Sequence, residues 1–174
     1  MKKTLSITVY NESGVLTRIS TVFSSRGFNI DSITVGSTED PGISRIIIVL
    51  PAEDETIVQI VKQLHKLVQV IHVKDITYTP CVERELMLIK IANTTRAIRL
   101  DLVQIAQIFR AKIVDISDDT LTMEITGDPG KIVTLQELLK NYNVLEIVRT
   151  GKIAIERELG INTESLKFFE RAKS

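Results

Sequence analysis

Apolar and polar residues alternate at the start of the chain, and the pattern then changes to helical spacing. Leu5, Ile7 and Val9 recur at every second position, which predicts a strand over residues 4–10. Val15, Ile19 and Phe23 recur at every fourth position, which predicts a helix over residues 15–25. Gly14 lies where the period changes, so the chain must turn sharply there, and a ligand or another backbone can approach closely.

The rest of the first half continues this alternation of strands and helices. Residues 29–35 have a weak apolar pattern typical of an edge strand, whereas the β-branched run at 44–50 predicts a central strand covered on both faces. A stripe from Ile57 to Val68 predicts the second helix, and residues 70–78 the fourth strand. The order βαββαβ favours an antiparallel sheet with both helices on one face, as in ferredoxin-like folds.

The second half repeats this architecture without repeating the sequence. We expect a strand at 85–92, a helix at 98–109, a hairpin across Asp118-Asp119, a helix that starts at 127–130 and a strand at 144–150. Nothing like residues 11–16 occurs after Ala92. The prediction is an α+β protein with domains at 1–79 and 85–158, a linker at 80–84, and a tail at 159–174 that is a short helix or disordered.

Composition excludes several classes of protein. The 174 residues are 44% hydrophobic and 25% charged, and 22 basic residues balance 22 acidic ones, which argues against a nucleic-acid surface. Cys81 is the single cysteine, so no intrachain disulfide can form. We expect no transmembrane helix and no targeting peptide. The expected location is therefore the cytoplasm, or the plastid stroma if the protein is organelle-encoded.

Catalytic signatures are scarce. His65, His72 and Cys81 lack the number and spacing of a zinc site, and no phosphate-loop or dinucleotide pattern occurs. Asp118 and Asp119 lie in a predicted hairpin turn, where exposure is the expected state. The sequence therefore predicts no catalytic residue and no metal site, which leaves binding as the function to consider.

The start of the first helix is the candidate binding site. Its unpaired N–H groups and the helix dipole can hold a small carboxylate, although a plain turn capped by Asn11 or Ser13 is the alternative. An amino acid would place its carboxylate on backbone N–H groups between Ser13 and Leu16 and its ammonium on Asn11 or Asn29. Its aliphatic side chain would need the apolar wall that Val15, Leu16 and Ile30 offer.

Asn29 and Ile30 open the predicted edge strand, and an exposed edge invites pairing with a second copy of the chain. If two copies pair there, these residues of one chain approach residues 11–16 of the other. Dimerisation would then build the pocket and couple ligand binding to subunit arrangement.

Several segments carry a resemblance to a known family. The first half looks like an ACT domain, and residues 11–18, 23–32, 40–45, 62–67 and 82–86 resemble the small regulatory subunits of acetolactate (acetohydroxyacid) synthase. Residues 109–115 and 149–151 carry a looser resemblance in the second half.

This resemblance implies a regulatory subunit without cofactors of its own. Thiamine diphosphate, Mg and FAD are expected only in the catalytic large subunit, which the small subunit binds, activates and makes sensitive to valine or a related amino acid. The family's effector site lies between the ACT domains of a homodimer and maps onto Asn11, Gly14, Val15 and Leu16 of one chain and Asn29 and Ile30 of the other. A transcription-linked sensor, an RNA binder and an enzyme are the alternatives, and each lacks a supporting feature: a basic helix, aromatic strands or a catalytic constellation.

Overall fold

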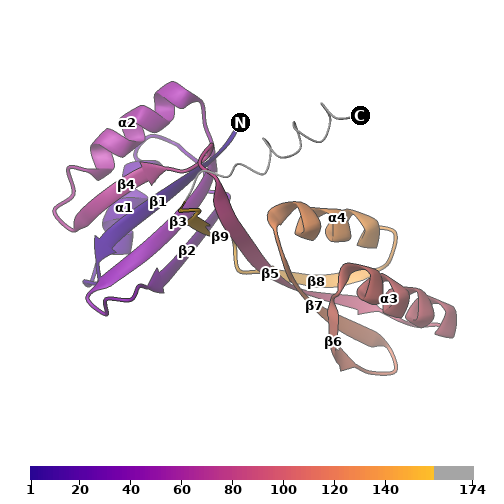
Figure 1. The fold of residues 1–174 in the computed structure, drawn as a ribbon. Coiled ribbons are helices and arrows are strands. Elements are labelled where there is room, and N and C mark those ends of the chain that lie inside the picture. Colours follow the sequence, from indigo (N-terminus) through magenta and orange to yellow (C-terminus); the bar gives the residue numbers. More distant parts are fainter. Residues whose placement is uncertain (159–174) are drawn as a thin grey trace, which may run out of the picture. The chain divides into compact units, whose positions relative to one another are not determined.

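The protein forms two compact α+β units in the computed structural model, which describes residues 1–158. One unit comprises Met1–Val82 and the segment that begins at Ala154, and the other comprises Glu83–Ile153. Figure 1 shows the elements of each unit. No helix within the described residues is long and apolar enough to cross a membrane.

The first unit contains a four-stranded antiparallel sheet in the order β2-β3-β1-β4. Its elements are β1 (Lys2–Tyr10), α1 (Val15–Ser24), β2 (Ser32–Ser37), β3 (Ile43–Pro51), α2 (Asp54–Leu64) and β4 (Val70–Asp75). The predicted βαββαβ order is confirmed, as are the edge position of β2 and the central position of β3.

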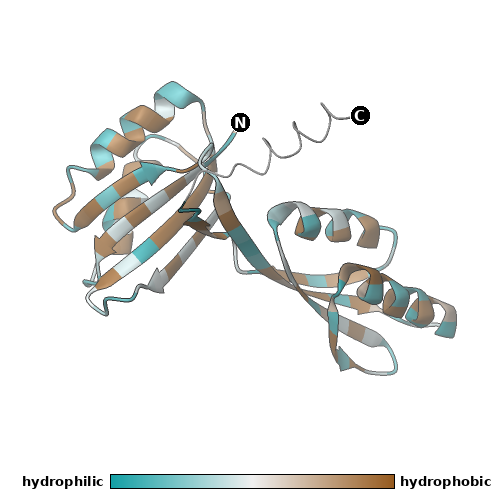
Figure 2. Ribbon diagram, viewed as in Figure 1, coloured by the Kyte–Doolittle hydropathy of each residue, from teal (hydrophilic) through white to brown (hydrophobic). Residues whose placement is uncertain are grey.

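The core of this unit follows the alternation in the sequence. Leu5, Ile7 and Val9 of β1 are buried in one cluster with the apolar stripes of α1 and α2. Figure 2 shows these stripes as brown bands between teal ones along α2. In β3, Ile46 and Ile48 belong to the same cluster, while Ile47 on the opposite face is only 3% exposed. On that opposite face, however, Arg45 is exposed and Val49 is half-buried. The cover on both faces that the β-branched run predicted is therefore complete only at Ile47.

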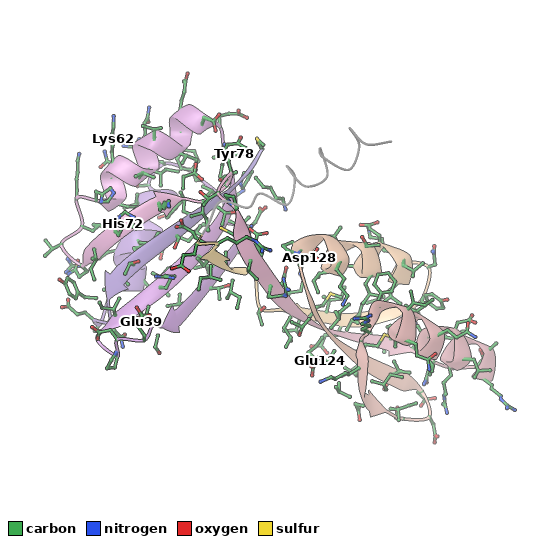
Figure 3. The ribbon with its side chains drawn as sticks, in the orientation of Figure 1. Glu39, Lys62, His72, Tyr78, Glu124 and Asp128 are labelled. Carbon is green, nitrogen blue, oxygen red and sulfur yellow. The ribbon has the colours of Figure 1, made fainter. Side chains whose placement is uncertain are left out.

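The second unit repeats the arrangement with the order β6-β7-β5-β8, and β9 pairs with β5 beyond this path. The sheet and its helices comprise β5 (Cys81–Ala92), α3 (Arg96–Phe109), β6 (Lys112–Ile116), β7 (Thr120–Gly127), α4 (Pro129–Leu139), β8 (Val144–Arg149) and β9 (Ile153–Glu156). The ends of β5 and β9, at Cys81–Val82 and from Ala154, belong to the first compact unit. Asp128, labelled in Figure 3, caps α4 by accepting a 2.9 Å hydrogen bond from the backbone N–H of Lys131. The predicted hairpin is confirmed, and so is the helix start within residues 127–130, since α4 begins at Pro129.

The repeat extends to single hydrogen bonds at the end of each unit's first strand. The backbone N–H of Tyr10, the last residue of β1, donates to the carbonyl of Gln69 at 2.9 Å. The backbone N–H of Ala92, the last residue of β5, donates to the carbonyl of Asn143, also at 2.9 Å. Tyr10 and Ala92 are therefore equivalent positions, which fixes how the loops that follow them correspond.

Three edge strands carry one extra residue. Ile71 in β4, Val114 in β6 and Leu145 in β8 each fall at a register shift and have no partner residue in the neighbouring strand. The fourth edge, β2, keeps a regular register with β3 from Ser32 to Ser37.

Several predicted boundaries differ from the structure. The strand expected at 29–35 begins at Ser32, so Asn29 and Ile30 precede it. Helix α2 ends at Leu64, and Val68, expected on its buried stripe, is 86% exposed. Four residues of the expected linker at 80–84 belong to β5, which begins at Cys81, and β9 was not predicted. The tail at 159–174 lies outside the described residues.

Candidate functional site

The start of α1 is built around a glycine in the left-handed conformation. Gly14 is the N-cap residue, with φ 82° and ψ −2°, and no side chain caps the helix. Neither Asn11 nor Ser13 caps the helix, so the capping that the plain-turn alternative assumed is wrong. The first helical N–H groups have no intrahelical acceptor, and no acidic residue occupies the first turn. A Cβ built on Gly14 meets nothing within 4 Å, so the space beside these donors is open.

Asn11 stands at the entrance of this turn. Its backbone N–H donates to the carbonyl of Gly42 at 2.8 Å, which anchors the loop to the start of β3. Its exposed side chain makes one long contact, from Nδ2 to the carbonyl oxygen of Pro41 at 3.5 Å. A ligand at the helix start can displace so weak a contact, which leaves the Asn11 amide available as both donor and acceptor.

The other predicted residues of this loop contribute in different ways. Ser13 is exposed, and Leu16 is 45% exposed, so both can contact a ligand. Val15 is only 5% exposed and belongs to the core cluster. It can offer its backbone N–H but not the apolar wall that we expected of its side chain.

Asn29 and Ile30 lie at the other end of the sheet. The neighbouring Asp31 donates its backbone N–H to Val49 at 2.8 Å and pairs with Lys2, at the first residue of β1, at 3.0 Å. Asn11 follows the last residue of β1, so the nine-residue strand separates the two predicted half-sites by roughly 30 Å. Within one chain the structure does not bring them together.

No catalytic or metal centre is found among residues 1–158. No group of three or more His, Cys, Asp or Glu side chains in this range could hold a metal ion. His65 and His72 are exposed and lie edge to face, with 6.4 Å between ring centroids. Figure 3 labels His72 on β4. Two imidazoles without a third ligand fall short of a zinc site.

Two cations with shifted pKa values have structural roles instead. The Asp54 carboxylate and the Tyr78 hydroxyl accept hydrogen bonds from the buried Lys3 ammonium and raise its pKa above its ordinary value. Arg149 donates to both carboxylate oxygens of Glu85, at 2.7 and 2.9 Å, and this pairing raises the pKa of its guanidinium. Each pair joins distant parts of one unit.

Comparison with known families matches both units. Residues 5–72 match a family described as the AHAS small subunit-like ACT domain. Residues 84–158 match a family described as the small subunit of acetolactate synthase.

Individual relatives agree with these matches. The acetolactate synthase small subunit of Aquifex aeolicus is 45% identical over 94% of this chain and 85% of its own length. That of Bacillus subtilis is 46% identical over 90% of this chain and 91% of its own. The chloroplastic small subunit 2 of Arabidopsis thaliana is 48% identical over 94% of this chain, which spans only 34% of that longer protein.

A solved structure extends the agreement to the fold. The crystal structure of the acetolactate synthase small subunit from Thermotoga maritima is 40% identical, with a TM-score of 0.81 over 91% of this chain and 99% of its own. The matches cover both units, and the resemblance expected from the loop residues is confirmed. The chain belongs to the acetolactate synthase small subunit family.

Proposed function

We propose that this chain is the regulatory subunit of an acetolactate synthase and that it binds valine or a related branched-chain amino acid at the start of α1. Binding would adjust the activity of a catalytic large subunit, which holds the thiamine diphosphate. The observation that carries the proposal is the uncapped helix start at Gly14, where a built Cβ meets nothing within 4 Å.

The chemistry of this loop suits the two charged ends of an amino acid. A carboxylate is stabilised by unpaired N–H groups and by the positive end of the α1 dipole. The ammonium group needs an acceptor, which the side-chain oxygen of Asn11 supplies. Leu16, half exposed beside these groups, offers an apolar surface to an aliphatic side chain.

A second chain would supply the remaining wall. Strand β2 is a regular edge strand, and its Ser32 end lies near residues 29–30 while its Ser37 end pairs with Ser44, near the Asn11 end of the sheet. Antiparallel pairing of β2 with its copy brings the Ser32 end of one chain to the Ser37 end of the other. Asn29 and Ile30 of the partner then approach the Asn11 loop, across the distance that separates them within one chain.

Mixing two defective chains tests this shared site. Asn11→Ala and Asn29→Ala chains should each bind valine weakly as homodimers. After dissociation and reassociation, a mixed dimer has one site with both defects and one intact site. Calorimetry on the mixture should recover wild-type affinity in a minority of sites. A mixture that stays as weak as its components would exclude a site shared between chains.

Regulation is tested with a candidate large subunit and an acetolactate assay. The wild-type chain should raise the rate, and valine should lower it again. The Asn29→Ala chain should still raise the rate while losing most of the valine response. A rate that does not change on adding the wild-type chain refutes the proposed partnership, and a collapsed circular dichroism spectrum in the variant would assign Asn29 a structural role instead.

A further inference from the structure

Asn93 is a buried amide that is not hydrogen-bonded through its side chain. The residue is 1% exposed, and neither its Nδ2 nor its Oδ1 has a partner among the described residues. Asn93 follows β5, where Met87, Ile89 and Ile91 face the core at every second position. The same alternation directs the Asn93 side chain to the helix-covered face, under the start of α3.

This residue occupies the place that Asn11 has in the first unit. The backbone N–H of Asn11 donates to the carbonyl of Gly42 at 2.8 Å, in the turn before β3. The backbone N–H of Asn93 donates to the carbonyl of Asp119 at 2.9 Å, in the turn before β7. Both asparagines come directly after the equivalent residues that end their first strands. They therefore stand at the same point of the repeated fold, each before a helix start.

Arg99 carries a second unpaired group and bonds to the same turn before β7. Arg99, on the first turns of α3, donates from Nη2 to the carbonyl oxygens of Ser117 and Asp118, at 3.4 and 3.1 Å. Its Nε atom is buried and, like the Asn93 amide, has no partner in the described part of the chain. Asn93 and Arg99 thus both bond to one hairpin, through the backbone N–H and through Nη2, and each also carries a buried side-chain donor without a partner among the described residues. The hairpin itself carries the exposed carboxylates of Asp118 and Asp119.

The donors and acceptors around this turn match a small zwitterion. The Asn93 amide and the Arg99 Nε–H offer donors to a carboxylate. The start of α3 adds little, because the Thr95 side chain caps it by accepting a 3.2 Å hydrogen bond from the backbone N–H of Ile98. The Asn93 oxygen and the two aspartates of the hairpin offer acceptors to an ammonium group. A single carboxylic acid or a single amine would satisfy only half of these groups.

We propose that the second unit holds its own site for a small 2-amino acid. The buried Asn93 amide would bind the ligand at the inner end of this site, and Arg99 would be the carboxylate-binding cation. The rim residues Thr94, Thr95 and Arg96 are exposed, so the ligand enters between the start of α3 and the hairpin. The site is separate from that at Asn11 and does not depend on it.

The test uses the full chain carrying Asn11→Ala, with 15N-labelled asparagine, titrated with L-alanine and followed by NMR. The Asn93 side-chain amide, assigned by its loss in Asn93→Leu, should shift and saturate. Acetate and ethylamine, which each carry one of the two charges, should shift it less. In Asn93→Leu, calorimetry should show an L-alanine affinity reduced about 10- to 100-fold. The free energy of unfolding of the ligand-free variant should stay the same or increase.

Several results would overturn the proposal. An Asn93 amide that does not respond to L-alanine, but shows transfer to a long-lived water, means an ordered water only. An L-alanine affinity that calorimetry finds unchanged in Asn93→Leu places the ligand elsewhere. Because Asn11 is already replaced in these chains, the outcome is separate from the fate of the Asn11 site.

Discussion

Gly14→Asp should weaken valine binding more than it weakens the fold. The substitution places a carboxylate at the N-cap of α1, where the proposed effector places its own. Because a Cβ at Gly14 meets nothing within 4 Å, the new side chain causes no clash within the chain. Its effect on binding therefore comes from charge and from occupying the open space.

The magnitude follows from the geometry of the helix start. Two carboxylates about 4 Å apart repel by about 1 kcal/mol in water and by about 4 kcal/mol at an effective dielectric constant near 20. Asn11 and Gly14 are exposed, so the lower part of this range applies, about 1–2 kcal/mol. The dissociation constant should rise about 5- to 30-fold. The left-handed φ of 82° costs an L residue about 1–2 kcal/mol of folding free energy, less for Asp or Asn.

The matched control is Gly14→Asn, which has the same shape and tolerates the same backbone conformation without the charge. Calorimetry with valine on both variants isolates the electrostatic contribution, and urea unfolding measures the strain that they share. Raising the salt concentration should narrow the difference between them. Equal affinities for Gly14→Asp and Gly14→Asn would refute the placement of the effector carboxylate at this helix start.

Three further substitutions test the fold and the assembly. Arg149→Met should destabilise the second unit by about 2–4 kcal/mol in urea unfolding, because it leaves the Glu85 carboxylate buried without its partner, while the partial exposure of the guanidinium limits the loss. Adding Glu85→Gln should restore part of the lost free energy of unfolding. Additive effects of the two substitutions would contradict the pairing. Asp54→Asn should lower the free energy of unfolding at pH 7, because Asp54 raises the pKa of Lys3. This loss relative to wild type should persist until the pH rises through the elevated pKa of Lys3. A loss that vanishes by pH 8 would contradict the role of the Lys3–Asp54 pair. Val35→Glu, on the β2 edge, should shift the dimer toward monomer in sedimentation velocity, because it brings like charges together across the two-fold axis. Val58→Glu, at a similarly exposed position on α2, is the control. Equal dissociation of the dimer by both variants would rule out β2 as the interface.

Periodicity predicted the fold well because each strand and helix buries one face. The alternation of Leu5, Ile7 and Val9 and the β-branched run of β3 identified the strands that fill the first core. Strand β9 escaped prediction because it has four residues, and its Ile153 and Ile155 are exposed rather than core-facing. Its pairing depends on β5, far away in the sequence, which no local pattern encodes.

The candidate site was predicted less completely. The sequence identified Gly14 as the turning point, but not that the glycine itself is the N-cap or that the Val15 side chain points into the core. Both depend on φ at one residue and on the register of α1 over the sheet. Asn93 was not predicted because the second half lacks the whole pattern of residues 11–16, whereas the repeat preserves one asparagine after an alternating strand. Aligning the two halves by strand ends would have found it.

The extra residues at the sheet edges bear on how the protein avoids aggregation in a crowded solution. An inserted residue bends its strand and breaks the regular row of N–H and C=O groups that a foreign strand would need. Ile71, Val114 and Leu145 therefore make β4, β6 and β8 poor templates, although each is an exposed apolar residue on an open edge. Strand β2 alone among these four edges offers an unbroken row. Three of the four edges compared thus discourage indiscriminate strand addition, while β2 allows another strand to add in register.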